Sequence, residues 1–256
     1  MKANEMFSVA GKKCIVTGAS RGIGKAFAEA LLENGATVVL VASSEKSVGP
    51  AVEEFKHKGY DAYGVAGDMS DNADTLRTFN DAVELLGGQL DVLVPCAGIQ
   101  YRCPVEDIPL EEFRKLYNVN VFHCWIMAQE AVKIMEKQEN GGKIIFVGSL
   151  GSHVAGENII PYSSSKGAVD MMAKGFARNV AGKGINVNLL SPGWIATDIW
   201  ADIPDQRKKE IAAGIPQGRV GFPEDMKGPL LFLASSASDY CNGAEIVVDG
   251  ALLVKL

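Results

Sequence analysis

Short apolar runs alternate with longer segments whose apolar residues recur at helical spacing through most of the 256-residue chain. This alternation is the pattern of βαβ units in a parallel sheet. The runs are rich in Val, Ile and Leu with little polar alternation, which is typical of strands that helices cover on both faces. The chain therefore predicts seven strands, at 13–17, 37–41, 62–66, 92–95, 143–147, 186–190 and 245–248.

Helical segments fit between these strands, at 22–34, 46–58, 71–86, 110–137, 162–181 and 223–235. The rhythm breaks only at 192–221, where Trp194, Trp200 and a basic cluster at 207–209 occur. A segment this long between two strands is more often functional than a plain connector, so we expect a substrate lid over about residues 193–221. Because the sequence has no repeat or Ser/Gly-rich linker, we predict one doubly wound α/β domain over residues 1–256.

Composition narrows the class of partner. The chain has 47% hydrophobic and 22% charged residues, which is typical of a globular enzyme. Its formal net charge of −6 argues against nucleic acid or an anionic membrane as the main partner. No apolar stretch approaches the roughly 18 residues that a membrane span needs. We therefore expect no membrane association.

The metal-binding and redox residues are scattered. Five cysteines lie far apart in the sequence with no disulfide or metal spacing, which predicts a reducing, cytoplasmic setting. The three histidines, His57, His123 and His153, are equally dispersed. No metal site is predicted.

The run Tyr162-Ser163-Ser164-Ser165-Lys166 places a phenol and an ammonium on one face of a helix. A free phenol is a poor base at neutral pH, but an adjacent cation favours the phenolate. The pair therefore indicates an acid/base device. The spacing alone is weak, since many exposed helices contain it by chance.

A glycine-rich loop, Thr17-Gly18-Ala19-Ser20-Arg21-Gly22-Ile23-Gly24, joins the first predicted strand to the first helix. Glycines permit a tight turn and close approach of a pyrophosphate, and the helix N-terminus offers N–H groups and a partial positive charge. The flanking strand and helix make a dinucleotide site the favoured interpretation over a structural turn.

Together with Asn120, Ser149 and Pro192-Gly193, these motifs resemble the short-chain dehydrogenase/reductase family over residues ~8 to 256. That resemblance implies hydride transfer between a nicotinamide dinucleotide and a carbonyl or secondary alcohol. It also implies four catalytic residues. Tyr162 is the general acid/base, and Lys166 assists it and binds the nicotinamide ribose. Ser149 orients the substrate oxygen, and Asn120 holds a water in a proton relay.

The choice of cofactor depends on the residues after the second strand. A carboxylate there would bind the adenosine ribose hydroxyls and repel a 2′-phosphate, but this chain has Ser43 and Ser44. With Arg21 in the loop, this favours NADP, although Glu45 leaves NAD open. The expected cofactor-binding residues are Gly18, Ser20, Arg21, Gly22, Ile23, Gly24, Ser43, Ser44, Asp68, Met69, Ala97, Gly98, Tyr162, Lys166, Pro192, Gly193, Ile195 and Thr197.

The chain departs from the family at Pro95-Cys96-Ala97-Gly98, where Asn-Asn-Ala-Gly is usual. Proline removes a backbone donor, and a thiol cannot replace a side-chain amide. Contacts at Ala97 and Gly98 depend on the backbone and on small size, so we expect them to survive. The packing around the fourth strand is left open.

For the substrate, the runs 97–102 and 160–169 and the tail 234–256 are similar to gluconate 5-dehydrogenases and related deoxyketogluconate dehydrogenases. This implies a small-molecule substrate, a sugar acid interconverted with its keto form. The expected substrate residues are Arg102, Ser149, His153, Tyr162 and Trp194, with the Arg102 guanidinium suited to a carboxylate. Two alternatives stay open: a 3-oxoacyl-carrier-protein reductase, and a catalytically silent dinucleotide-binding scaffold. The family usually forms homotetramers.

Overall fold

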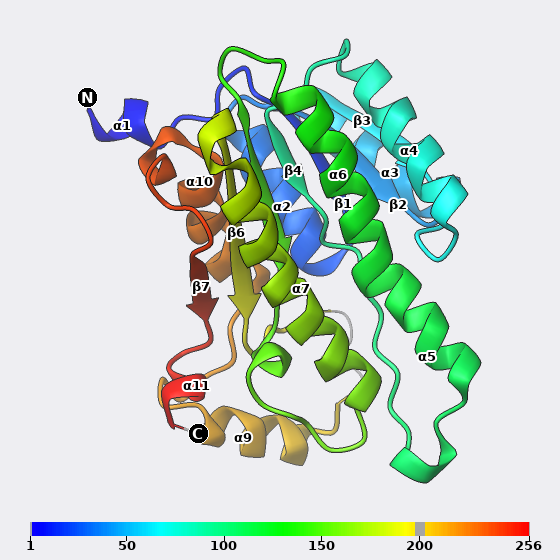
Figure 1. The fold of residues 1–256 in the computed structure, drawn as a ribbon. Helices are drawn as coiled ribbons and strands as arrows, with labels where there is room; N and C mark the ends of the chain where they lie inside the picture. The colour runs from blue at the N-terminus through cyan, green and yellow to red at the C-terminus, as the bar shows by residue number, and fades with distance from the viewer. Residues whose placement is uncertain (1, 198–202, 256) are drawn as a thin grey trace.

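The computed structural model describes residues 2–197 and 203–255. Within them, seven parallel strands form one sheet in the order β3-β2-β1-β4-β5-β6-β7 (Figure 1). The strands are β1 (Lys13–Thr17), β2 (Thr37–Ala42), β3 (Ala62–Ala66), β4 (Val92–Val94), β5 (Gly142–Val147), β6 (Ile185–Pro192) and β7 (Glu245–Val248). The predicted doubly wound parallel sheet is confirmed, and each strand lies within two residues of its expected bounds.

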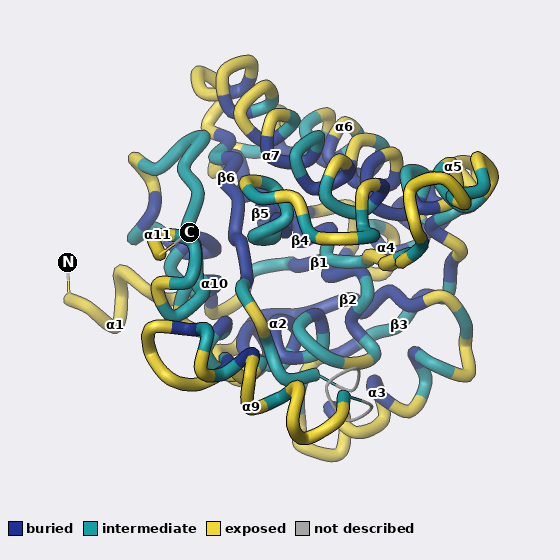
Figure 2. Tube along the Cα trace, turned by 90° about the horizontal axis from the view of Figure 1, so that it is seen from below, coloured by how far each residue is buried: buried dark blue, intermediate teal, exposed yellow. Residues whose placement is uncertain are grey.

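Helices cover both faces of this sheet, as its apolar strands require (Figure 2). One face carries α2 (Gly22–Glu33), α3 (Glu45–His57) and α10 (Lys227–Ala234), and the other carries α4 (Asn72–Leu85), α6 (His123–Met135) and α7 (Ile160–Val180). The remaining helices are α1 (Ala3–Met6), α5 (Leu110–Tyr117), α9 (Asp205–Gly214) and α11 (Leu252–Lys255). In the described part of the chain, no helix has both the length and the apolar character needed to cross a membrane.

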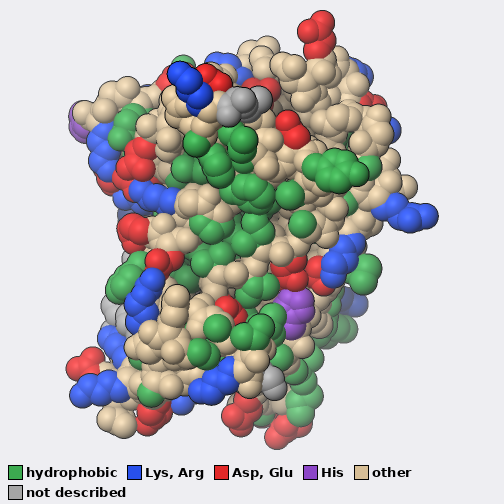
Figure 3. Space-filling model, turned by 90° about the vertical axis from the view of Figure 1, so that its left-hand side faces the viewer, with side chains coloured by type: hydrophobic (Ala, Val, Ile, Leu, Met, Phe, Trp, Pro, Cys, Tyr) green, Lys and Arg blue, Asp and Glu red, His purple; other side chains and the backbone are tan. Residues whose placement is uncertain are grey.

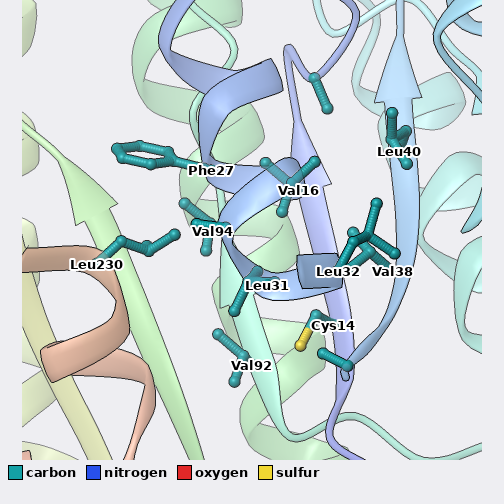
Figure 4. Close-up of a cluster of buried hydrophobic side chains, with 14 of the residues drawn as sticks. Cys14, Val16, Phe27, Leu31, Leu32, Val38, Leu40, Val92, Val94 and Leu230 are labelled. Carbon is teal, nitrogen blue, oxygen red and sulfur yellow. The ribbon is translucent and has the colours of Figure 1, made fainter. Parts of the chain in front are cut away.

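Alternation along each strand divides the core into two clusters. Cys14 and Val16 of β1 pack with the α2 face, whereas Ile15 between them packs with the α6 face. Figure 4 shows the first cluster, in which Phe27 and Leu31 of α2 lie among side chains from β1, β2 and β4. Because strand side chains point to both faces, the strand interiors are mostly apolar, although β6 buries Asn188 and Ser191.

Two predicted helices are irregular. The segment expected as one helix over 110–137 contains a π-helical turn, η2 (Asn118–Phe122), between α5 and α6. The helix expected over 223–235 begins as a 3₁₀ turn, η5 (Pro223–Met226), before α10. A π-turn widens the helix locally and often occurs at a functional site, and helical periodicity in the sequence does not reveal it.

The carboxyl ends of the strands meet at one edge of the sheet, at the bottom of Figure 1. The 3₁₀ turn η3 (Leu150–Ser152), helix α9 and the start of α7 lie at this edge. Ligands of parallel sheets bind at this edge.

Candidate active site

The glycine loop between β1 and α2 forms a tight turn that only glycine permits at its first position. Gly18 has a φ of +66°, and a Cβ there would lie 2.9 Å from the Cα of Ala97. A Cβ on Gly24 would overlap the carbonyl oxygen of Gly18. The loop is therefore pressed against the segment that follows β4.

The N-terminus of α2 fits the pyrophosphate of a dinucleotide. Arg21 occupies the N-cap position, and among the described residues no side chain caps the first turn by a hydrogen bond. N–H groups of a helix's first turn lack helical partners, so they are available to an anion. Gly22, with a φ of +56°, faces the Thr197 side chain across the turn. The residues present thus suit the cofactor that the sequence implies.

The other predicted cofactor residues follow the carboxyl ends of neighbouring strands. Ser44 is the N-cap residue of α3, and its Oγ lies 2.8 Å from Ser47 Oγ. The Asp68 carboxylate accepts a bond from Ser70 N at 2.8 Å, and Met69 is buried. These residues therefore lie at the edge of the sheet that also carries the glycine loop, and so do Ser43, Ala97, Gly98, Pro192, Gly193, Ile195 and Thr197.

The base of the predicted lid is tied to the sheet. Gly193 N bonds to Val248 O at 2.9 Å, and Ile195 pairs with Gly221 in a parallel bridge. The predicted lid contains helix α9, but part of it, including Trp200, lies outside the described residues. Trp194 lies at the start of the lid and is 40% exposed.

The side chains of Ser149 and Tyr162 both lie beside Gly151. A Cβ on Gly151 would lie 3.4 Å from Tyr162 Cε1 and 3.5 Å from Ser149 Oγ. Ser149 follows β5 and Tyr162 lies in the first turn of α7, so the end of a strand and the start of a helix position the pair. Ser149 Oγ accepts a bond from Gly151 N at 3.0 Å, which leaves the hydroxyl hydrogen free for a ligand.

Lys166 is buried behind Tyr162, one turn further along α7. Its Nζ lies 5.8 Å from the centroid of the Tyr162 ring and donates to Val147 O at 2.9 Å. An ammonium has three N–H donors, so two stay available for other partners. The predicted phenol and ammonium pair is thus brought together.

Asn120 lies in the π-turn and clamps the segment after β4. Its Oδ1 accepts from Ile99 N at 2.9 Å, and its Nδ2 donates to Ile99 O at 3.0 Å and to Ser165 Oγ at 3.1 Å. The protein thus engages both the oxygen and the nitrogen of this amide, and the backbone carbonyl of Asn120 accepts a weak bond from Cys124 Sγ at 3.3 Å.

The unusual Pro95-Cys96 pair is accommodated without distorting β4. Pro95 is buried, and its carbonyl accepts a weak bond from Cys124 Sγ at 3.8 Å. Burial raises the pKa of Cys96 to about 11 although the Lys166 charge opposes this, so the thiol stays neutral at physiological pH.

Of the predicted substrate residues, Arg102 and His153 have protein partners. Arg102 Nη1 donates to Glu157 O at 3.1 Å, which places the guanidinium beside the loop leading into α7. His153 Nε2 lies 2.8 Å from Glu245 Oε1 on β7, so only its Nδ1 is left to meet a substrate hydroxyl.

His123 is a residue whose place in the site the sequence does not reveal. It is fully buried, and its Nε2 lies 3.4 Å from Thr17 Oγ1 at the start of the glycine loop. In the sequence it is one polar residue inside an apolar helix. Only the neighbouring Asn120 motif could have drawn attention to it.

Comparison with known proteins identifies the class. The chain belongs to the short-chain dehydrogenase/reductase family, since residues 18–252 match the family model described as Enoyl-(Acyl carrier protein) reductase. It is 39% identical over 249 residues to a 2-dehydro-3-deoxy-D-gluconate 5-dehydrogenase of Pseudoalteromonas atlantica, covering 96% of this chain and 97% of that protein. The protein is thus an NAD(P)-dependent dehydrogenase that acts on CH–OH groups.

Other relatives share the fold over the full length. An L-rhamnose 1-dehydrogenase (NADP(+)) of Thermoplasma acidophilum is 36% identical, with 98% of this chain and 100% of that protein covered. The structure of a gluconate 5-dehydrogenase from Burkholderia cenocepacia in complex with NADP and tartrate matches with a TM-score of 0.92 at 32% identity, covering 100% of both chains.

The buried state of His123 predicts a pH dependence of stability. Burial is the main cause that lowers its pKa to about 4; a hydrogen bond to the Val119 backbone opposes this shift, and the Lys166 charge adds to it. An unfolded histidine titrates near ~6.5. Between these values the unfolded chain binds a proton that the folded protein excludes, so the free energy of unfolding falls as the pH drops from about 6.5 to about 4. The loss is on the order of 3 kcal/mol at most.

Urea denaturation of wild type and His123→Gln between about pH 7 and about pH 4.5 measures this contribution. The variant has no group to titrate at this position, so its stability should fall less steeply. His57→Gln, at an exposed histidine of α3, should keep the wild-type slope. If the free energy of unfolding falls with pH equally steeply in wild type and His123→Gln, the prediction is contradicted.

Proposed function

We propose that this protein transfers a hydride between NADP(H) and a sugar acid or its keto form, of the gluconate and 5-ketogluconate type. The observation that carries the proposal is that Ser149 and Tyr162 both lie beside Gly151, with the buried Lys166 close to the Tyr162 ring. The glycine loop lies at the same edge of the sheet. Such a group can move a proton to or from an oxygen held beside a bound dinucleotide.

The preference for NADP rests on the residues that follow β2. Ser43 and Ser44 stand where a carboxylate would repel a 2′-phosphate, and Arg21 adds a positive charge at the neighbouring loop. The solved gluconate 5-dehydrogenase that matches this chain over its full length holds NADP. Glu45 is exposed at the start of α3, and its carboxylate is the feature that would favour NAD instead.

The proton is handled by this chain's own residues. When bound, the nicotinamide supplies or accepts the hydride. In oxidation, Tyr162 Oη takes the proton of the substrate hydroxyl, and in reduction it returns it. Ser149 Oγ donates its free hydrogen to the same substrate oxygen, and Lys166 holds a positive charge beside the phenolate. Asn120 positions the 97–99 segment against the ligand.

The sugar-acid proposal is supported by the place of Arg102. Its bond to Glu157 O and the bond from Cys103 N to Asn158 O, at 2.9 Å, join the segment after β4 to the loop that leads into α7. Tyr162 lies only four residues beyond Asn158 in the chain. A guanidinium in this position can pair with the carboxylate of a sugar acid whose carbinol carbon faces Tyr162.

Substitution of Tyr162 tests the acid/base role. Tyr162→Phe removes only the hydroxyl, so kcat with any accepted substrate should fall roughly 100- to 10,000-fold. Binding of NADPH, followed by its fluorescence, should stay within about threefold of wild type because the glycine loop is untouched. Retained turnover in the variant would disprove the mechanism, and absence of turnover in wild type on every substrate would favour the silent scaffold.

Substitution of Arg102 tests the substrate class. Arg102→Gln should raise the KM for 5-ketogluconate roughly tenfold or more through loss of a charged hydrogen bond, with little effect on an uncharged ketone. Arg178→Gln, in the last turn of α7, is the matched control and should leave both values unchanged. The assay follows reduced cofactor with sugar acids, polyols, ketones and an acetoacetyl thioester. Turnover of the thioester alone would instead identify a 3-oxoacyl-carrier-protein reductase.

We further propose a homotetramer, on the basis of two exposed apolar surfaces. Trp125 of α6 and Met171 of α7 are 46% and 65% exposed on the outside of the molecule. The second surface lies along the β7 edge, where Figure 3 shows hydrophobic side chains gathered in the middle of the face. Clustered apolar side chains of this kind are typical of subunit interfaces.

Light scattering should therefore give four times the 27.2 kDa mass of one chain. Met171→Glu should shift the protein to a smaller assembly, since a charge would be buried against the partner. Leu76→Glu, at an exposed leucine of α4, should leave the mass unchanged. A wild-type mass of one chain would rule out the tetramer.

A further inference from the structure

The segment 95–99 lies between the two halves of the site. Gly18 of the phosphate loop presses on Ala97, and Gly98 faces Lys166, whose Nζ would lie 3.9 Å from a Cβ at that position. A small shift of this segment would therefore change both the phosphate loop and the surroundings of the ammonium. The segment has few hydrogen-bonding groups of its own that could fix its position, because Pro95 has no N–H and Cys96 has only a thiol.

The structure shows that outside residues hold the segment at two positions. Ala97 N donates to Thr17 Oγ1 at 2.9 Å, and Ile99 is clamped by Asn120 through both its N–H and its carbonyl. Asn120 is anchored in the π-turn. Thr17, at the end of β1, depends on a further residue, because its hydroxyl hydrogen needs an acceptor of its own.

His123 provides that acceptor. Its Nε2 lies 3.4 Å from Thr17 Oγ1, and both ring nitrogens lie 3.7 Å from Cys124 Sγ. A neutral imidazole has one N–H donor and one bare nitrogen. Thr17 Oγ1 already accepts from Ala97 N, so its own hydrogen is left to donate, and a bare Nε2 of His123 is the matching acceptor. The result is a continuous chain from the Ala97 amide to the start of α6, in which each bond polarises the next.

We propose that His123 is a positioning residue for the cofactor, which fixes the Ala97 segment through Thr17 where Pro95-Cys96 replaces the side-chain amides usual in the family. The inference rests on the proposed dinucleotide binding, and it assigns a residue that the acid/base mechanism does not use. It predicts that the buried imidazole is neutral with hydrogen on Nδ1. It also predicts that loss of the acceptor weakens the binding of NADPH rather than the proton transfer.

Two variants separate the effect of losing the hydrogen-bond acceptor from the effect of losing the volume of the ring. His123→Leu keeps an apolar side chain but leaves the Thr17 hydroxyl without its acceptor, so the Kd for NADPH should rise roughly tenfold while kcat changes less. His123→Gln can present a carbonyl oxygen to Thr17 and should recover most of the affinity. Met127→Leu, at a buried position one turn along α6, is the control for core repacking and should bind NADPH as wild type does.

Measurements without cofactor test the chain directly. Amide hydrogen exchange of Ala97 should be faster in His123→Leu than in wild type or His123→Gln. In Thr17→Val the hydroxyl is already gone, so adding His123→Leu should weaken NADPH binding little further. The ¹⁵N shifts of His123 should show a protonated Nδ1 and a bare Nε2.

The outcomes distinguish this inference from the function on which it rests. Failure of wild type to bind NADPH would refute the proposed function. Normal NADPH binding by wild type together with equal affinity in His123→Leu would overturn the role of His123 alone. If His123→Leu does not fold, the tautomer of the wild-type imidazole decides. Hydrogen on Nε2 would overturn the proposal, whereas a bare Nε2 together with near wild-type NADPH affinity in His123→Gln would support it.

Discussion

The approach of two strand ends is the constraint on which the site depends. β1 and β4 are neighbours in the sheet, but the chain leaves β1 toward α2 on one face and reaches β4 from α4 on the other. The connections diverge at this point, and a crevice opens at the carboxyl edge. Because no helix separates the two strand ends, the glycine loop touches the segment after β4, where Gly18 leaves no room for a Cβ beside Ala97. The glycine loop and the segment after β4 are thus one packed unit.

A buried positive charge organises the second half of the site. Lys166 is 7% exposed, and within residues 2–197 and 203–255 its charge has no carboxylate partner in a salt bridge. A buried charge without a counterion favours an anion nearby and disfavours another cation. The Tyr162 ring is the nearest such neighbour in the proposed mechanism, with its centroid 5.8 Å from Lys166 Nζ. The same charge, together with burial, keeps His123 neutral and therefore able to accept a hydrogen bond. Burial is the main cause of the low pKa of His123, and the Lys166 charge adds to it.

The sequence predicted those parts of the structure that local pattern determines. The strands follow from apolar runs, and the glycine loop follows from its place between a strand and a helix. Tyr162 and Lys166 follow from helical spacing. The π-turn was missed because the apolar periodicity of 110–137 continues across it. The clamp of Asn120 on Ile99 and the contact of His123 with Thr17 were not predicted, because they join residues 21 and 106 positions apart. The carboxylate partner of His153 comes from β7, 92 residues further on, so no local pattern could indicate it.

The residues proposed to run the reaction and those proposed to select the substrate are held in different ways. Tyr162, Lys166 and Ser149 sit on a strand end and the first turns of a long helix, whose positions the core determines. Arg102 sits in a loop held by hydrogen bonds to another loop, and Trp194 begins the lid. Loops tolerate substitution because few packed side chains depend on them. Substitutions in these loops can therefore change which substrate is accepted without disturbing proton transfer. This explains why the shared motifs identify the chemistry of this chain, whereas its substrate has to be argued from single loop residues.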